Sequence, residues 1–493
     1  MMQINGGGLW ETSLLGRLLM FVLVLWDESW IGRAVAALGR FSARVFNGSL
    51  FGRLLYSDWP SSLMARESVV GRLVAWLGRV VTAFGRWSAG FFRGTWESSL
   101  LGRLARGIFR ALLPAFGSSL LVSAFTGYAA DVVPAAGERG EQRTSPVLYV
   151  LGLVLGLVPV LPSSGGGIFS PTLLTVAGIW LVAVLWVVVK FMQDDYEWRG
   201  SSAMLPLLLL LVVAAVSTVQ SASRRDSLLQ FIIWVSAVLL FWVTVNLVRT
   251  TRDAAVLLGP VFVGGALMGL WAGYQYFISH PVVLEAWSDP TTFGTLVRAF
   301  AGMGNPNYLG EYMTLFLPLG VALWFQVRPK RRLELGALLA LMAFALLVTW
   351  SRGAWLALII ALAIFVFMRA RRWSIFMVLG GLAGLVVAPS SVLARLTSAF
   401  STQDSSNAFR VNIWIGVEHM LQKWWFIGAG LGAPAFEKVY SEYMLAAARA
   451  AHTHNLYREL FAEMGILGLI CVRWSGVALF RRPGVRGLKA PRS

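Results

Sequence analysis

Residues 203–222 read AMLPLLLLLVVAAVSTVQSA, a run of bilayer length without a charged side chain. A helix needs about 20 mostly apolar residues to cross the hydrocarbon core of a membrane. Similar runs lie near 147–161, 168–192, 227–248, 254–278, 308–327, 333–350, 353–370 and 374–390, with a weaker one near 455–472. The pattern predicts an all-α fold, a polytopic transmembrane helix bundle of about ten spans.

The composition of the whole chain fits this interpretation. Of 493 residues, 57% are hydrophobic and 13% are charged, and the mean hydropathy is +0.68. Soluble domains usually contain about 25% charged residues. The formal net charge of +18 fits lysines and arginines that face the cytoplasm and anionic lipid, and no nucleic-acid-binding module accompanies it. We therefore expect membrane lipids as partners and no nucleic acid.

A repeat region precedes the spans. Residues 1–112 carry a degenerate S-x-x-G-R repeat, with arginines spaced by seven at Arg72, Arg79 and Arg86. On a helix this spacing produces a single basic stripe. The region fits either a basic amphipathic helix on an anionic membrane surface or helices packed against one another or against the bundle.

Three further parts follow. Residues 113–290 hold the first transmembrane helices. Residues 291–472 form a second transmembrane domain, whose last spans are separated by a large external loop at 391–454. A basic tail covers 473–493, where Arg473 breaks the last apolar run early, as expected of a truncated or frame-shifted end.

The charged turns predict the orientation in the membrane. Positively charged loops collect on the cytoplasmic side. Three turns fit that rule: RTTRD at 249–253, RPKRR at 328–332 and RARRW at 369–373. Counting spans from them places 279–307, 351–353 and 391–454 together on the outer face. We expect a multi-pass protein of the cytoplasmic (inner) membrane.

Two motifs at the outer ends of the spans carry polar side chains. RAFAGMGNPNYLGEYM begins at Arg298, and its Asn-Pro-Asn turn contains Asn305 and Asn307. Asn307 is expected to cap the following helix, so these asparagines either serve as a cap alone or also bind substrate. In TWSRGAW, Arg352 lies at the membrane boundary, where it either snorkels to the interface or binds phosphate.

The external loop holds two further motifs. In FRVNIWIGVEHMLQKWW, apolar residues recur at helical spacing, which predicts an amphipathic helix with Arg410 in its first turn. In AHTHNLYRELFAEMG, His452 and His454 lie two residues apart. No metal-binding signature accompanies them, so a metal site is disfavoured. Either one neutral histidine is a general base for a hydroxyl nucleophile, or it only hydrogen-bonds at the mouth of the last span.

Taken together, NPNYLGEYM, TWSRGAW, FRVNIW, the glycine turn after WW and HNLYRELFAEMGILG resemble the O-antigen ligase and O-antigen polymerase family of polytopic bacterial membrane proteins. The resemblance covers roughly residues 290–470. It implies a glycosyltransferase on the outer face of the cytoplasmic membrane that needs neither metal nor cofactor. The implied donor is a polyprenyl-diphosphate-linked oligosaccharide, and the implied acceptor is a glycan, a lipid or a protein.

The resemblance also implies which residues act. By their positions in the motifs, His454, Arg410 and Arg352 are the catalytic candidates. Arg298 is a further match. Together with Asn305, Asn307 and His452, which the residue types in the motifs single out, it forms the candidate set for substrate binding. Arginine forks bind the charge of a diphosphate leaving group without a metal, and a histidine accepts the proton of the acceptor hydroxyl.

Three alternatives stay open at this point. The motifs do not separate a ligase, which moves a finished chain to another acceptor, from a polymerase, which extends a lipid-linked repeat unit. A multi-span transporter is a competing class, although the chain lacks symmetric halves and intramembrane charges. A catalytically inactive membrane scaffold is the third, because of the basic repeats and the early break at Arg473.

Overall fold

The computed structural model describes residues 145–162, 170–192, 199–280, 297–369, 405–445 and 448–480. The chain divides into two compact units, Leu73–Ala354 with Phe400–Ser493, and Met1–Arg72 with Trp355–Ala399. All the candidate site residues lie in described parts of the unit that contains Ala354. The repeat region 1–112 and the predicted span near 374–390 lie outside the described residues.

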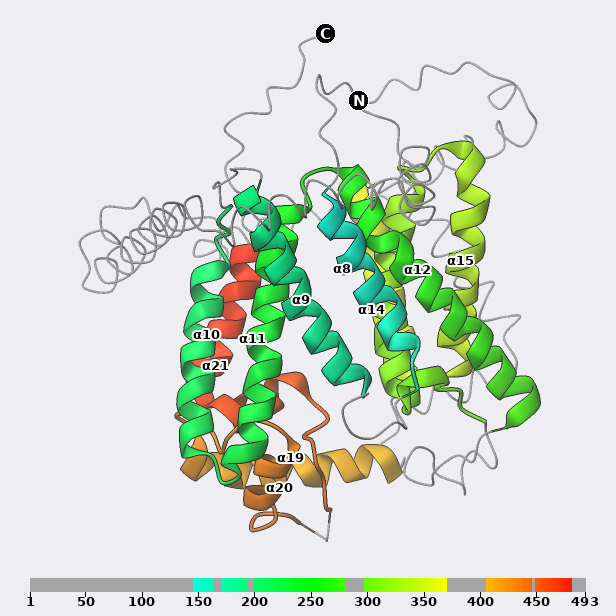
Figure 1. Ribbon diagram of the computed structural model, residues 1–493. Helices are drawn as coiled ribbons and strands as arrows, with labels where there is room; N and C mark the ends of the chain where they lie inside the picture. The colour runs from blue at the N-terminus through cyan, green and yellow to red at the C-terminus, as the bar shows by residue number, and fades with distance from the viewer. Residues whose placement is uncertain are drawn as a thin grey trace, which may run out of the picture. The chain divides into compact units, whose positions relative to one another are not determined.

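Helices build the described part of the chain, and no strand occurs in it (Figure 1). The unit that contains Ala354 holds α8 (Pro146–Leu157), α9 (Pro171–Met192), α10 (Met204–Gln220), α11 (Arg224–Leu247), α12 (Thr251–Tyr274), α14 (Pro306–Trp324), α15 (Pro329–Val348), α19 (Ser405–Trp424), α20 (Ala433–Tyr440) and α21 (Leu456–Phe480). From Trp355 onward, α16 (Arg352–Arg369) belongs to the other unit. Each predicted span within the described residues coincides with a helix, which confirms the all-α class there.

Several of these helices have the length and apolarity of membrane spans. Within the described residues, four meet both criteria: Pro171–Lys190, Arg224–Leu247, Thr251–Ser279 and Leu456–Leu479. Shorter apolar helices cover Pro146–Val160, Met204–Gln220 and Arg352–Met368. The first turns of α14 and α15 are more polar, with Asn307 in one and Lys330 to Arg332 in the other. The total of about ten spans stays a prediction.

The last helix is longer than the sequence predicted. We expected a weak span that ends near 472, yet α21 continues through Arg473 to Phe480. The charge at Arg473 is accommodated because its guanidinium lies 5.7 Å from the centre of the Tyr457 ring, a favourable cation–π geometry.

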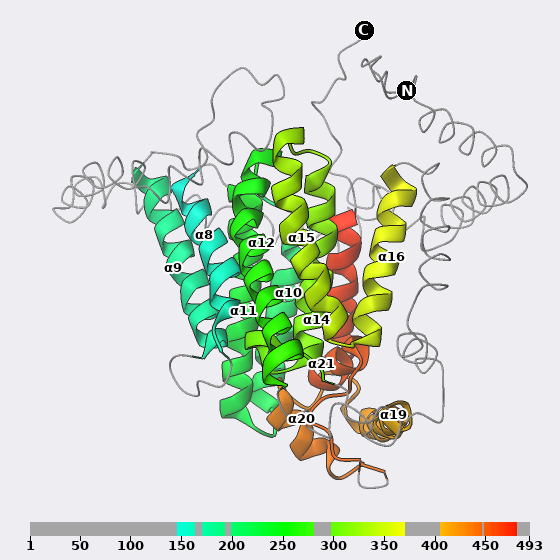
Figure 2. The ribbon, with the colours of Figure 1, turned by 90° about the vertical axis from the view of Figure 1, so that its right-hand side faces the viewer.

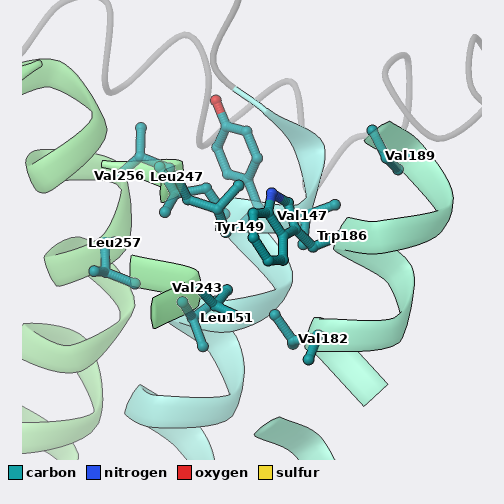
Figure 3. Close-up of a cluster of buried hydrophobic side chains, with 12 residues drawn as sticks. Val147, Tyr149, Leu151, Val182, Trp186, Val189, Val243, Leu247, Val256 and Leu257 are labelled. Atoms are coloured by element: carbon teal, nitrogen blue, oxygen red, sulfur yellow. The ribbon is translucent and has the colours of Figure 1, made fainter. Parts of the chain in front are cut away.

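Close packing joins the early helices. A buried cluster of Leu148, Trp186, Val243 and Val256 connects α8, α9, α11 and α12 (Figure 3). On α8, a Gly-x-x-x-Gly pair ending at Gly156 lets the backbone of α12 approach closely. Such small-residue contacts are typical of helix association in lipid, where van der Waals packing replaces the hydrophobic effect as the driving force.

The two ends of this unit differ in chemistry. Helices α19 and α20 lie at the end where α10 finishes and where α11 and α21 begin, as two perpendicular views show (Figure 1, Figure 2). The basic turns at 249–253 and 328–332 lie at the opposite end (Figure 1). The end that carries α19 and α20 therefore holds the candidate site.

Candidate functional site

The residues that precede α21 form a tight loop held from two sides. Thr453 is fully buried, and its amide N–H donates to Glu459 Oε2 at 2.6 Å. Its carbonyl oxygen accepts a hydrogen bond of 2.9 Å from the Trp414 indole nitrogen, and its hydroxyl donates to the Asn455 carbonyl at 2.9 Å. The two peptide groups that flank Thr453 are therefore fixed by side chains from α21 and α19.

His454 adopts a left-handed backbone conformation directly after this residue. Its φ is 53°, a region that costs a non-glycine residue about 1–3 kcal/mol. The next residue, Asn455, caps α21, since its side-chain oxygen accepts from the N–H groups of Tyr457 and Arg458. The loop thus presents an exposed imidazole from a fixed backbone.

The surroundings of His454 favour its neutral form. Desolvation by the protein around the ring is the largest cause that lowers its pKa below 6.5, even though the side chain keeps an exposed surface. The positive charge of Arg410 is the second cause and His452 the third, while Glu459 acts weakly in the opposite direction. At neutral pH the imidazole therefore keeps a lone pair that can accept a proton.

Arg410 lies on α19, as predicted, but one turn further along. The helix begins at Ser405, upstream of the apolar pattern that starts at Phe409, so Arg410 falls in the second turn and the prediction of the first turn is wrong. The side chain is partly buried. Its charge acts on His454 from the neighbouring element, so the structure brings these two candidates together.

His452 has the opposite electrostatic character. Its Nδ1 lies 3.5 Å from Glu459 Oε1, and the side-chain hydrogen bond to Glu459 is the main cause that raises its pKa above 6.5. Two histidines separated by one residue therefore have pKa values shifted in opposite directions. Environments that push two titratable groups apart are typical of sites that divide acid and base roles.

Helix α19 is fastened to α21 by one arginine. The Arg458 guanidinium donates to Glu418 Oε1 at 2.8 Å and to the Trp414 carbonyl at 3.2 Å, and it lies 5.1 Å from the centre of the Trp414 ring. Glu418 on α19 is thus paired with Arg458 on α21. These contacts fix α19, which carries Arg410, relative to α21 and the His454 loop that precedes it.

The glycine turn GAGLG at 428–432 is hydrogen-bonded to α21, the helix that follows the His454 loop. The amide of Ala429 donates to the Ala462 carbonyl at 2.8 Å, and the amide of Gly432 donates to the buried carboxylate of Glu463 at 2.7 Å. The turn is therefore bonded to α21 through both backbone and side chain.

Gly465 breaks α21 at this contact. Its φ is 64°, and a Cβ at this position would overlap the carbonyl of Phe426. The amide of Ile466 donates to the Trp425 carbonyl at 2.8 Å. Only glycine combines the positive φ with so close a backbone approach, so the HNLYRELFAEMG motif ends where its helix must bend.

A second polar cluster lies where α14 and α16 begin and α15 ends. Arg298 is 3% exposed, and its Nε donates to the Thr349 carbonyl at 2.9 Å. Its Nη2 donates to Asn307 Oδ1 at 3.0 Å, and the Ser351 hydroxyl donates to the same oxygen at 3.2 Å. The structure thus joins two predicted substrate-binding residues, the buried Arg298 and the partly buried Asn307, in one hydrogen-bond network.

The cap of α14 differs from the prediction. Asn305, rather than Asn307, is the N-cap, since its backbone is extended and its side-chain oxygen accepts from the Asn307 amide at 2.8 Å. Asn307 is already helical, which frees its side chain for the Arg298 network. Arg352 is partly buried and follows this network directly, after Trp350 in a left-handed conformation with φ 53°.

Sequence reasoning missed Gln275, which lies directly after α12 and binds the chain next to this cluster. The side chain is 5% exposed, and its Oε1 accepts from the amides of Phe300 and Ala301 at 2.9 and 2.7 Å. It begins a π-helical turn, Gln275–Ser279, a feature often found at functional sites. A glutamine near the end of an apolar span was the available signal.

The candidates thus form two groups at one end of the unit. His452, His454 and Arg410 gather at the junction of α19 and α21, whereas Arg298, Asn305, Asn307 and Arg352 surround the start of α14 and the end of α15 (Figure 1). Over the described ranges, no group of three or more His, Cys, Asp or Glu side chains is placed to hold a metal ion.

Apolar helices of membrane-spanning length, with an arginine- and histidine-bearing site at one end, define a polytopic membrane protein with a polar site at the membrane boundary. Residues 337–472 match the family model described as O-Antigen ligase, which confirms the predicted resemblance to the O-antigen ligase and polymerase family over this segment. The matched segment contains Arg352, Arg410, His452 and His454, but not Arg298, Asn305 or Asn307. No curated protein matches the chain.

Proposed function

We propose that this chain transfers or polymerises oligosaccharide from a polyprenyl-diphosphate donor on the outer face of the cytoplasmic membrane. The observation that carries the proposal is the pairing of an exposed histidine of lowered pKa, His454, with the guanidinium of Arg410. A base and an anion-binding group close enough to interact electrostatically are what glycosyl transfer from a diphosphate requires.

The reaction follows from that arrangement. His454 accepts the proton of an acceptor hydroxyl while its oxygen attacks the anomeric carbon of the donor sugar. The bond from that carbon to the diphosphate oxygen breaks, and the electron pair leaves with the lipid diphosphate. Arg410 and Arg352 bind the charge that develops on the leaving group, a role for which the planar guanidinium is well suited. No metal ion takes part in this scheme.

The location of the basic turns supports the outer-face assignment. The turns at 249–253 and 328–332 lie at the end opposite α19 and α20 (Figure 1). Because basic loops are retained in the cytoplasm, the end with His454 faces outward. The apolar helices provide surfaces along which a polyprenyl tail lies in the bilayer.

The test is glycan transfer by the full chain in proteoliposomes, with chelator present. The assay supplies a polyprenyl-diphosphate oligosaccharide and a panel of glycan, lipid and protein acceptors. We expect transfer by the wild type and loss of about 100- to 10,000-fold with His454→Ala, the range for removal of a general base.

The matched control is His419→Ala, an exposed histidine on α19. It should retain full activity. Transfer that His454→Ala leaves intact would eliminate the base assignment. A wild type that is inactive with every acceptor would instead favour the scaffold alternative.

A further inference from the structure

The left-handed backbone of His454 requires an explanation outside His454 itself. A non-glycine residue keeps a positive φ only where its surroundings hold it there. Asn455 caps the following helix and sets the backbone on the C-terminal side. The constraint on the N-terminal side comes from the two peptide groups around Thr453.

Both of those peptide groups are fixed by side chains. Glu459 Oε2 accepts from the Thr453 amide at 2.6 Å, and the Trp414 indole donates to the Thr453 carbonyl at 2.9 Å. The carbonyl that Trp414 holds belongs to the peptide group that ends at the His454 nitrogen. Its plane therefore sets φ of His454 and the direction in which the imidazole leaves the backbone.

The geometry points to Trp414 and Glu459 as positioning residues for His454, acting through the backbone of Thr453. This inference rests on the proposed role of His454 as the base. Neither side chain needs to touch the substrate. Trp414 comes from the FRVNIW motif and Glu459 from the HNLYRELFAEMG motif. The contact between Trp414 and Thr453, 39 residues apart, explains why both motifs serve one group.

Other contacts make the clamp rigid. Arg458 donates to Glu418 and to the Trp414 carbonyl and covers the Trp414 ring, so the indole is held on its face and at its backbone. The second carboxylate oxygen of Glu459 faces His452 Nδ1 at 3.5 Å. Each clamping side chain is thus itself fixed by a second contact.

The test separates position from stability with three variants. Trp414→Phe removes the indole donor and keeps an aromatic ring under Arg458. Glu459→Ala removes the acceptor for the Thr453 amide, whereas Glu459→Gln keeps an acceptor oxygen of the same reach. Each full-length variant is assayed in proteoliposomes for kcat and for donor KM, and its folded fraction is checked by size-exclusion chromatography.

We expect Trp414→Phe and Glu459→Ala to lower kcat about 10- to 100-fold, the effect of a misplaced catalytic group, and to change donor KM less than about twofold. Glu459→Gln should restore kcat to within about threefold of the wild type. The double variant Trp414→Phe with Glu459→Ala should lose less than the product of the single losses, because both side chains act through one residue.

Matched controls are Trp425→Phe and Glu442→Gln, both exposed side chains of the same region. They should leave kcat unchanged. Wild-type kcat in Trp414→Phe and Glu459→Ala would overturn the inference, as would equal losses in Glu459→Ala and Glu459→Gln. If His454→Ala were also fully active, the proposed base itself would fail. If only His454→Ala were inactive, the base would stand and the positioning role would fall.

Discussion

The two groups of candidate residues both have a backbone fixed by hydrogen bonds, but they differ in how far their side chains are exposed. Around Arg298, side chains bond to one another and to backbone, and the arginine is 3% exposed. Around His454, the backbone is just as firmly held, yet the side chains of His454 and His452 stay exposed. Each group contains a left-handed residue, Trp350 or His454, at φ 53°.

The contrast separates support from chemistry. A buried polar network whose members are satisfied gives rigidity and is costly to interrupt. An exposed imidazole on a rigid backbone is available to a substrate. Changes at Arg298 or Asn307 should therefore reduce stability and activity together, whereas changes at the tip of the His454 loop should reduce activity alone.

Among the variants that test this contrast, the largest effect should come from Arg410→Gln. Loss of one group that stabilises developing charge lowers kcat about 100- to 1,000-fold. The positive charge of Arg410 helps to lower the pKa of His454, with His452 acting in the same direction and Glu459 in the other. Without it that pKa rises. Because only neutral His454 accepts a proton, the acidic limb of the rate profile should move to higher pH.

The pH–rate profile of kcat measures this shift. The control is Arg449→Gln, because Arg449 is an exposed arginine in the segment just before His452. Thermal unfolding of each variant shows that the protein is folded. An acidic limb that stays in place in Arg410→Gln would show that the two groups are not coupled.

Asn307→Ala should disrupt the hydrogen-bond network around Arg298. The change removes the oxygen that accepts from Arg298 and Ser351 and leaves buried donors unsatisfied. We expect a loss of about 2 kcal/mol in the free energy of unfolding, with transfer activity falling in proportion to the folded protein. Denaturation in detergent gives the stability, and Asn412→Ala on α19 is the control. Normal stability with impaired donor binding would instead assign Asn307 directly to the substrate.

Asn305→Ala should have a smaller effect of the same kind. The substitution removes the N-cap of α14, which is worth about 1 kcal/mol, and Asn305→Ser should restore most of it because serine caps equally well. The unfolding midpoints of Asn305→Ala and Asn305→Ser are compared with that of the wild type. Equal midpoints for alanine and serine would indicate that the side chain does more than cap.

Glu418→Gln should have the smallest effect. Its ion pair with Arg458 is exposed, and such pairs contribute about 0.5 kcal/mol or less, decreasing further with salt. The uncharged variant should transfer glycan at the wild-type rate. A loss of kcat would mean that the pair, rather than the indole contact, sets the position of α19.

The helices were predictable because apolar runs of bilayer length leave few alternatives. The run near 168–192 became α9 at Pro171–Met192. The other runs within the described residues match nearly as closely, apart from the last, which α21 exceeds. Boundaries failed where capping decides them. The start of α19 lies upstream of its apolar pattern, and two asparagines around one proline do not reveal which is the cap until their backbone angles are known.

The site was predictable as a set of residue types but not as an arrangement. His454 and Arg410 stood out because charged and titratable residues are rare in this chain. The bond between Trp414 and Thr453 depends on the packing of two helices far apart in sequence, so no local pattern announces it. Gln275 was missed for the same reason, since its partners lie about 25 residues further on.

The contact between the glycine turn at 428–432 and α21 has a consequence for biogenesis. The turn at 428–432 reaches its bonded form only when Ala462 and Glu463 on α21 are in place. That helix is made after the other described helices, so the backbone amides of Ala429 and Gly432 stay without these acceptors until it enters the bilayer. The loop that carries His454 gains its hydrogen bond to Glu459 in the same event, so insertion of α21 becomes the step that completes the candidate site.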